Sequence, residues 1–442
     1  MIYIRAIHFA ATIMAAGVVF FAVCIAAPAL RHNGIARAAA AFRSRLAVIG
    51  WCSLSLCVLS GAAWLVLTAA AMSGAPPGRV FSEGVLWTVL LRTDFGNDWL
   101  ARLVLAGLLG GALVPLLSRK PAAPRWIAAA AVVLAAALVG SLAWAGHAVG
   151  SNGIEGVVHP AADVLHLIAA AAWLGTLPLL ALFLALLLAQ PQHDDDAVAA
   201  ARVATLRFSA LGIVSVGALL ATGIVNTWYL AGSVPALVGT PYGRLLLAKV
   251  ALFAGMVAIA AVNRFRLTPQ LVPNASSGAS SRARDAVRRL RRNALAETLI
   301  GAGIVIIVAA LGTEPPASHV HQHPVYGAVP ADAAFVHIHG EGGMADITIL
   351  PGRAGLARAT IRLWDADLVG LLDAREVTVT LAPPTAGSNP TTRVAVQDAD
   401  GAWQVGRFRL SQPGNWMVTV DAVLGPAKHL VLAAPIVIEP EK

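Results

Sequence analysis

Apolar residues dominate the first 312 positions of the chain, and shorter alternating segments follow them. An α-helix rises about 1.5 Å per residue, so about 20 apolar residues cross the hydrocarbon core of a bilayer. The long apolar runs cover roughly residues 2–30, 46–71, 98–117, 126–147, 159–189, 203–231, 243–263 and 293–312. This pattern predicts an all-α polytopic membrane bundle of eight transmembrane helices over residues 1–312.

The tail, residues 333–442, shows period-two alternation interrupted by turn signals every 8–12 residues. The predicted strands are FVHIHG, ADITILP, ARATIRLWD, EVTVTLAP, RVAVQD, WQVGRFRL, NWMVTVDAV and HLVLAAPIVIE. This pattern is typical of an all-β immunoglobulin-like sandwich. Residues 313–332 form a histidine-rich linker between the two parts. All three cysteines precede the tail, so the sandwich is expected to fold without disulfides.

Composition supports a membrane protein, because 58% of the 442 residues are apolar and only 12% are charged. The net charge of +9 divides into +13 for residues 1–312 and −4 for residues 313–442. The excess of basic residues therefore reflects membrane topology, and no nucleic-acid partner is expected.

Basic residues mark alternate loops, which predicts the orientation of the bundle by the positive-inside rule. Loops 31–45, 118–125 and 264–292 are rich in arginine. The only basic residues in loops 72–97, 148–158 and 232–242 are Arg79 and Arg92. Loop 190–202 is ambiguous because of its three aspartates. The N-terminus and the tail are therefore expected outside. The first span has no basic stretch before it, so we expect an uncleaved helix rather than a signal peptide.

Ten of the twelve histidines fall on the predicted outer side. Ionisable side chains are costly inside a bilayer, so each is a candidate functional residue. His159, Asp163 and His166 are spaced by four and three residues, which places them on one helical face. We predict a metal site in an outward-facing vestibule, formed by His8, His147, His159 and His166. The alternative is that these are interfacial side chains satisfied by water and helix ends.

Further polar residues are expected near this vestibule. Met14 and Asp163 are additional candidate ligands, and Asp163 is alternatively a partner that fixes a histidine tautomer. Asn226 and Lys249 are candidates for its lining. Cys24, Cys52 and Cys57 lie towards the predicted inner halves of their helices, where thiolates would suit Cu(I) at an exit site. Packing of small residues between helices is the favoured explanation for these cysteines.

A second cluster of histidines lies at the start of the tail. His319, His321 and His323 alternate within SHVHQHP, and His337 and His339 repeat that spacing on the first predicted strand. Alternate residues of an extended segment share one face. We therefore predict a second metal site here, for which the ligands alone allow copper, zinc or nickel.

Several stretches resemble the copper resistance protein D family. They are IRAIHFAATIMAAGVVFF (4–21), HLIAAAAWLGTLPLL (166–180), TPYGRLLLAKVALFAGMVAIAAVNRFRLTP (240–269) and RRNALAETLIGAGIVIIVAALGTEPPA (291–317). The resemblance implies a bacterial inner-membrane protein of eight helices that moves copper, usually inward, together with a periplasmic copper-binding protein. His8 and His166 match the family's histidine positions best. QPGNWMVTVDA (412–422) resembles a strand of the periplasmic sandwich domains fused to such units.

Three functions follow from these observations. The first is a copper transporter in which tail histidines capture Cu(I) or Cu(II) and pass it to the vestibule. No ATP-binding or phosphorylation motif is present, so the membrane potential would draw the cation inward. The second is a membrane protein that binds haem b between paired histidines. The third is a copper delivery or assembly protein that transports nothing. No catalytic motif is present, so no enzyme is expected, and the sequence leaves the oligomeric state open.

Overall fold

The computed structural model describes the chain except residues 31–32, 74–77, 79, 82–84, 93, 119–123, 146–154, 191–194, 232–233, 272–276, 314–329, 331, 341–342, 365–370, 385–388, 426–427 and 442. The chain divides into two compact units. The first comprises Met1–Ala69, Val80–His147 and Val158–Ala317, and the second comprises Ser318–Lys442 with the short segments Ala70–Arg79 and Ala148–Val157.

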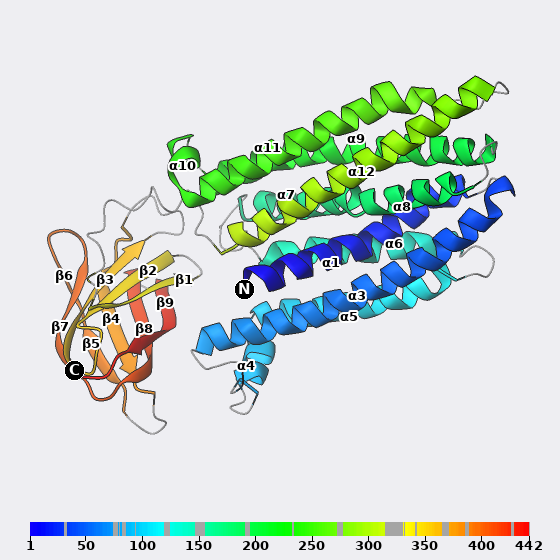
Figure 1. Cartoon of the computed structure of the whole chain (residues 1–442). Coiled ribbons are helices and arrows are strands. Elements are labelled where there is room, and N and C mark those ends of the chain that lie inside the picture. Colours follow the sequence, from blue (N-terminus) through cyan, green and yellow to red (C-terminus); the bar gives the residue numbers. More distant parts are fainter. Residues whose placement is uncertain are drawn as a thin grey trace. The chain divides into compact units, whose positions relative to one another are not determined.

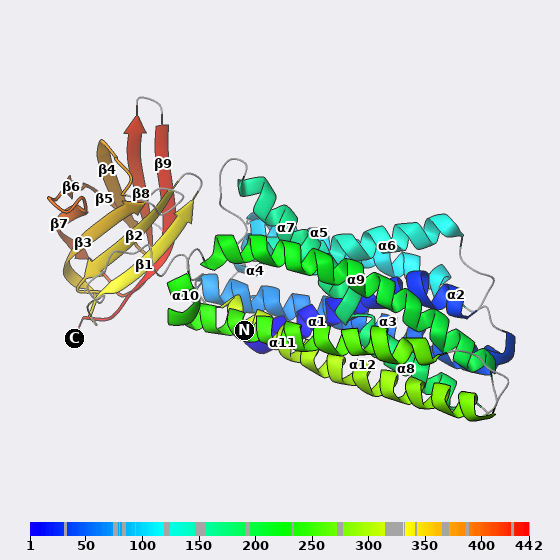
Figure 2. The same ribbon diagram turned by 90° about the horizontal axis from the view of Figure 1, so that it is seen from above.

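The first unit is a bundle of long helices (Figures 1 and 2). Within the described residues, eight helices are long and apolar enough to cross a membrane, which confirms the eight predicted spans. Their elements are α1 (Ile2–Phe20) continued by a π-helix (Phe21–Ala26) and α2 (Ala27–Ala29), α3 (Ala36–Ser73), α5 (Asp94–Leu116), α6 (Arg125–Gly140), α7 (Glu155–Leu174) followed by α8 (Leu177–Leu188), α9 (Asp195–Ala231), α11 (Pro241–Val262) continued by η4 (Asn263–Leu267), and α12 (Ser277–Leu311). Two short helices are α4 (Val85–Arg92) and α10 (Val234–Gly239).

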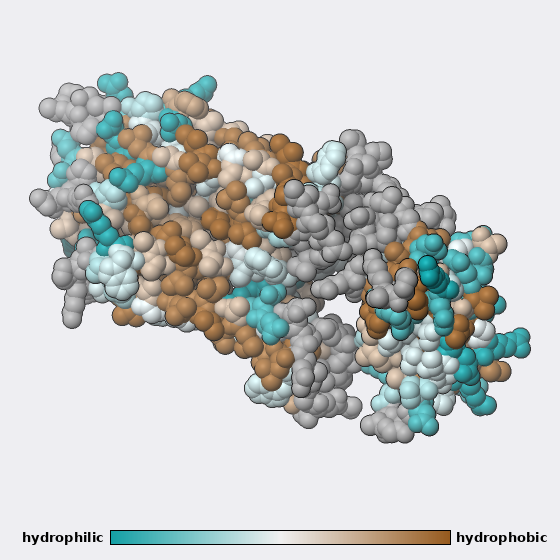
Figure 3. All heavy atoms as spheres, turned by 180° about the vertical axis from the view of Figure 1, so that it is seen from behind, coloured by the Kyte–Doolittle hydropathy of each residue, from teal (hydrophilic) through white to brown (hydrophobic). Residues whose placement is uncertain are grey.

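The surface of the bundle is apolar, as a helix that faces lipid requires. Large side chains point outward from it, and Val214, Ile224, Trp228 and Leu299 are each more than 70% exposed. In Figure 3, apolar residues cover the sides of the bundle, and hydrophilic residues gather at one end.

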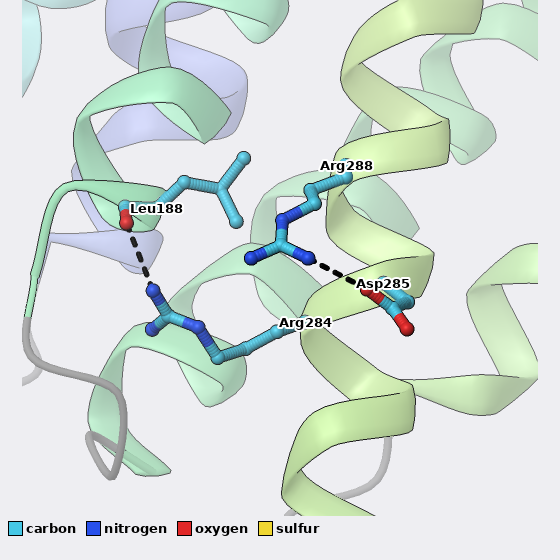
Figure 4. Close-up of polar contacts among 4 residues, drawn as sticks. All are labelled: Leu188, Arg284, Asp285 and Arg288. Carbon is cyan, nitrogen blue, oxygen red and sulfur yellow. Dashed lines mark hydrogen bonds and ion pairs between the residues drawn. The ribbon is translucent and has the colours of Figure 1, made fainter.

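At the start of α12, arginine side chains form hydrogen bonds and an ion pair at that hydrophilic end. Arg284 donates to the carbonyl oxygen of Leu188 at 2.9 Å (Figure 4). It also donates to the carbonyl oxygen of Gln190 at 3.3 Å. The last carbonyls of a helix have no partner within it, so an arginine placed there caps α8 and complements its dipole. Arg288 and Asp285 form an ion pair at 2.8 Å one turn along α12 (Figure 4).

Two glycines bring α1 against the turn that joins α7 to α8. A Cβ atom on Gly17 would lie 2.3 Å from the carbonyl oxygen of Gly175, and one on Gly175 would lie 2.4 Å from that of Ile13. Small residues allow helix backbones to approach closely in membranes. Here they hold together the two helices that carry His8 and His166.

The second unit is a sandwich of two antiparallel sheets, as predicted. One sheet has the order β1-β2-β3-β7-β6 and the other β5-β4-β8-β9. The strands are β1 (Ala334–Gly340), β2 (Gly343–Leu350), β3 (Gly355–Trp364), β4 (Glu376–Ala382), β5 (Thr391–Val394), β6 (Val396–Gln397), β7 (Trp403–Leu410), β8 (Gly414–Gly425) and β9 (Lys428–Ile438). The inward-facing residues of both sheets form one core, with Ile347, Ile361, Val377, Val418 and Val420 fully buried.

The predicted strand RVAVQD differs from the structure in one respect. It divides at Ala395 into β5, which pairs with β4, and β6, which pairs with β7 of the other sheet. Ala395 is 4% exposed, and its N–H donates to the carbonyl oxygen of Val377. The alternating pattern specifies an extended chain but not the sheet to which each half pairs.

Candidate functional site

His8 lines a cavity between α1, α3, α5 and the end of α6. The cavity walls include Thr12, Cys57, Trp99, Arg102 and Leu142. His8 is 5% exposed, and its ring packs edge-on against Trp64 at 5.5 Å between centroids. A Cβ on Gly61 would lie 3.1 Å from the ring, so this glycine gives the imidazole its space on α3.

The hydrogen bonds of His8 define which ring nitrogen is available. Nδ1 lies 3.1 Å from the carbonyl oxygen of Cys57 and 3.1 Å from the hydroxyl of Ser60. The carbonyl only accepts, and Ser60 already donates to Leu56 at 2.6 Å, so Nδ1 carries the proton. The lone pair is therefore on Nε2, which makes no hydrogen bond within the described residues. A neutral imidazole in this tautomer is ready to bind a metal ion.

Cys57 is the second metal-ligating side chain of this cavity. The hydroxyl of Thr12 donates to the carbonyl oxygen of His8 at 2.7 Å, and its oxygen lies 3.2 Å from the Cys57 sulfur. The single hydroxyl proton is thus used, so the thiol of Cys57 donates to Thr12. The sequence analysis placed Cys57 towards the opposite half of the bundle from His8, whereas in the structure the two residues are neighbours.

Arg102 brings a positive charge to the same cavity. Its side chain is 6% exposed and donates to the carbonyl oxygen of Ser141 at 2.8 Å, while its Nε has no hydrogen-bond partner among the described residues. A buried guanidinium repels a bare cation and attracts a thiolate. The charge of Arg102 therefore favours binding of a cation in this cavity only when Cys57 is deprotonated.

His166 belongs to a separate polar cluster formed by α7, α9 and α11. Its Nδ1 lies 2.9 Å from the hydroxyl of Thr222, which itself donates to the carbonyl oxygen of Ala218 at 2.6 Å. Thr222 therefore accepts from His166, and the lone pair is again on Nε2. The ammonium of Lys249 lies 3.5 Å from this Nε2. In this conformation a lysine occupies the position that a metal ion would take.

The remaining residues of this cluster pair with each other. Asn226 donates to the Asp163 carboxylate at 3.1 Å, and the oxygen of its side-chain amide is buried without a partner from the described segments. His159 is 5% exposed and stacks on the Tyr229 ring at 5.0 Å. Asp163 thus contacts Asn226 rather than fixing a histidine tautomer.

The structure does not gather the predicted ligands into one metal centre. Within the described part of the chain, no three His, Cys, Asp or Glu side chains form a group that could hold a metal ion. Met14 and Cys24 pack against the hydrophobic core, and Cys52 is exposed. Of the other predicted ligands, His147, His319, His321 and His323 lie outside the described residues, and His337 and His339 occupy β1 opposite Asp346 and Met344.

Arg102 and Glu297 are among the buried ionisable residues that the sequence analysis missed. Arg102 lies in the cavity of His8, and Glu297 of α12 is fully buried. Both lie within predicted spans, where the cost of charge in a bilayer marks a residue as functional. That signal was available in the sequence.

Two family models match the chain. Residues 1–157 match the model described as "Copper resistance protein D-like, N-terminal domain", and residues 201–311 match "Copper resistance protein D". The chain is 32% identical over 283 residues to "Copper resistance protein D" of Pseudomonas syringae pv. tomato, covering 62% of this chain and 84% of that protein.

Two further relatives are similar to this chain. "Copper transport protein CutJ" of Bacillus subtilis strain 168 is 24% identical over 80% of this chain and 60% of its own length. "Inner membrane protein YebZ" of Escherichia coli strain K12 is 33% identical over 48% of this chain and 70% of its own length.

Proposed function

Because this chain belongs to the copper resistance protein D family, we propose that it carries copper ions across the bacterial inner membrane, inward, with the tail outside. The relatives named for copper transport and for the inner membrane support the process and the location. The distribution of arginine among the loops supports the orientation.

The cavity of His8 and Cys57 is the observation that carries this proposal. One unprotonated imidazole nitrogen and one thiol line the same buried space. Soft thiolate and imidazole ligands suit Cu(I). Arg102 compensates the thiolate, so a Cu(I) ion with neutral His8 and ionised Cys57 leaves only one positive charge in the cavity.

We propose that the cluster of His166 is a second copper-binding site. A copper ion reaches Nε2 only after the ammonium of Lys249 has moved away, because both cannot occupy the lone pair. The carboxylate of Asp163 attracts the ammonium of Lys249. We propose that a periplasmic copper-binding protein transfers copper to the histidines of the linker and of β1. These histidines then pass copper to the sites at His8 and His166.

Copper binding by purified full-length protein tests the proposal. We expect His8→Ala and Cys57→Ala each to weaken Cu(I) binding by at least tenfold in competition with a colourless chelator. X-ray absorption should show one sulfur and one or more nitrogen ligands in the wild type. Cys52→Ala is the matched control and should bind as the wild type does, because this cysteine is exposed. Equal binding by all four proteins would refute a site at His8 and Cys57.

Two readouts separate the alternative functions. Haem b would give a Soret absorption band that His8→Ala or His166→Ala removes. A delivery protein would bind copper but give no copper accumulation in proteoliposomes, whereas a transporter accumulates it in proportion to an inside-negative potential.

A further inference from the structure

Glu297 is an acidic side chain that the copper sites do not use. It lies in the middle of α12 (Ser277–Leu311), within the span Ser281–Leu311, and its exposed fraction is 0%. Leucine, isoleucine and alanine residues precede and follow it along the helix. A carboxylate in such surroundings is strongly destabilised unless a cation or several donors compensate it.

The contacts of Glu297 do not provide that compensation. Oε1 accepts one hydrogen bond, from the amide of Asn263 at 2.8 Å, and Oε2 is buried with no partner in the part of the chain that the structure describes. Asn263 in turn accepts from the amide of Asn293 at 2.7 Å. Both donors are neutral, and no ion pair of Glu297 occurs within the described residues.

Within the described residues, the charged groups of the elements around α12 do not pair with Glu297. α12 packs against α1, α8, α9, α11, η4 and the 3₁₀-helix η5 (Thr268–Gln270). Arg207 of α9 donates to the carbonyl oxygen of Cys24, and Arg264 of η4 donates to Ser209 at 2.6 Å. The remaining cationic or titratable side chains of these elements form no hydrogen bond or ion pair with Glu297 within the described residues: Tyr3, Arg5, His8, Asp195, Asp196, Arg202, Tyr229, Tyr242, Arg244, Lys249 and Arg266.

A polar route leads from Glu297 to one end of the bundle. Arg289, Asn293 and Glu297 are four residues apart, so they follow one face of α12. Arg289 is exposed, Asn293 is partly buried and Glu297 is fully buried. Asn263 joins this row at the first residue of η4, a π-helix, and Thr268 donates to its carbonyl oxygen at 2.7 Å. Single π-helical turns are frequent at functional sites, where they re-aim side chains.

We propose that Glu297 is a proton-binding site of the membrane unit. In the conformation described here its carboxyl group carries a proton on Oε2, and Oε1 accepts from Asn263 as a neutral carbonyl does. The proton exchanges with water along the row of Asn263 and Asn293, at the end of the bundle where α12 begins. Release converts Glu297 to a carboxylate and frees one proton.

This site gives the proposed copper movement a coupled ion. The step rests on the proposed function: when Cu(I) binds, Cys57 loses its thiol proton to water, and Cu(I), the thiolate and Arg102 together leave one positive charge in the cavity. Loss of one proton from Glu297 to the water at the start of α12 offsets that charge, which lowers the cost of holding a cation in the membrane interior.

Infrared spectroscopy of the full-length protein in vesicles tests the proton site without copper. At neutral pH the wild type should show a carboxylic acid C=O band that shifts in D₂O and disappears in Glu297→Gln. The glutamine keeps the bond from Asn263, so the variant should retain the thermal stability of the wild type. Glu376→Gln, an exposed carboxylate on β4, is the control and should keep the band. If Glu297→Gln instead removes carboxylate bands, the proton site is refuted.

Addition of Cu(I) then tests the coupling. The band of the wild type should decrease, and a pH-sensitive dye should report about two protons released per copper ion bound, one from Cys57 and one from Glu297. Glu297→Gln should bind copper and release only about one proton, from Cys57. Copper binding with an unchanged band would refute the coupling. A wild type that binds no copper would refute the proposed function, while the copper-free band would still decide whether Glu297 holds a proton.

Discussion

The contact between Gly17 and Gly175 allows a quantitative test of how the helices of the two histidine clusters are held together. In Gly17→Ala the new Cβ would lie 2.3 Å from the carbonyl oxygen and 2.6 Å from the Cα of Gly175. Ordinary contact begins near 3.4 Å, so the backbones must separate by about 1 Å. Both partners are backbone atoms, so no rotamer change relieves the overlap. We expect the overpacking to cost about 1–3 kcal/mol.

Gly107→Ala is the matched control, because it lies in a helix and its Cβ would meet nothing within 4 Å. Replacing glycine by alanine in a helix stabilises it by about 0.5–1 kcal/mol, and this gain is common to both variants. The difference between them therefore isolates the packing cost. Reversible unfolding in mixed detergent micelles should show Gly17→Ala less stable than Gly107→Ala by about 1–3 kcal/mol. Equal free energies of unfolding for the two variants would refute the close backbone contact.

Two predictions concern the sandwich. Hydrogen bonds from Gln404 and from the backbone N–H groups of Ala402 and Asp400 hold the pKa of Asp398 below its usual value. The ionised Asp398 therefore stabilises the folded sandwich above the unfolded-state pKa, and this stabilisation is lost as pH falls through the folded-state pKa. Asp398→Asn should therefore show faster hydrogen exchange in residues 396–404 at neutral pH, with a smaller further increase in acid than the wild type; identical pH profiles would contradict this role. Ile347→Ala, at a position with 0% exposure, should destabilise the sandwich by about 2–5 kcal/mol in hydrogen-exchange measurements. Val437→Ala, 62% exposed, should change it by less than about 0.5 kcal/mol, and comparable losses in the two variants would contradict the assigned core.

Hydrophobic periodicity was sufficient to predict the architecture of both units. The spans follow from the length of each apolar run, and the strands follow from alternation, because one face of each sheet is buried. The ends of the helices were less predictable. α3 begins at Ala36 and α12 at Ser277, well before the predicted spans, because alanine and arginine favour helix outside the bilayer as well.

The candidate site was only partly predictable, because its geometry depends on how each helix rotates about its own axis. The proximity of Cys57 to His8 arises where α3 packs against α1, and no spacing within either helix encodes it. Lys249 lies 3.5 Å from the ring of His166, and this distance depends on the packing between α7 and α11. Glu297 is different, since a single acid within an apolar run was visible in the sequence.

His8 and His166 have the same tautomer, but their Nε2 atoms differ in how freely a metal ion can reach them. This difference predicts the order in which copper occupies the two sites. Both rings carry the proton on Nδ1 and keep a lone pair on Nε2. At His8 that nitrogen has no protein partner within the described residues, whereas at His166 an ammonium lies 3.5 Å away. Displacing a buried ammonium costs free energy that binding at His8 does not require. Copper should therefore occupy His8 first, and Lys249→Met should strengthen binding at His166 while leaving His8 unchanged. Equal affinity of the two sites in the wild type, measured with His8→Ala and His166→Ala in turn, would show that Lys249 does not oppose the ion.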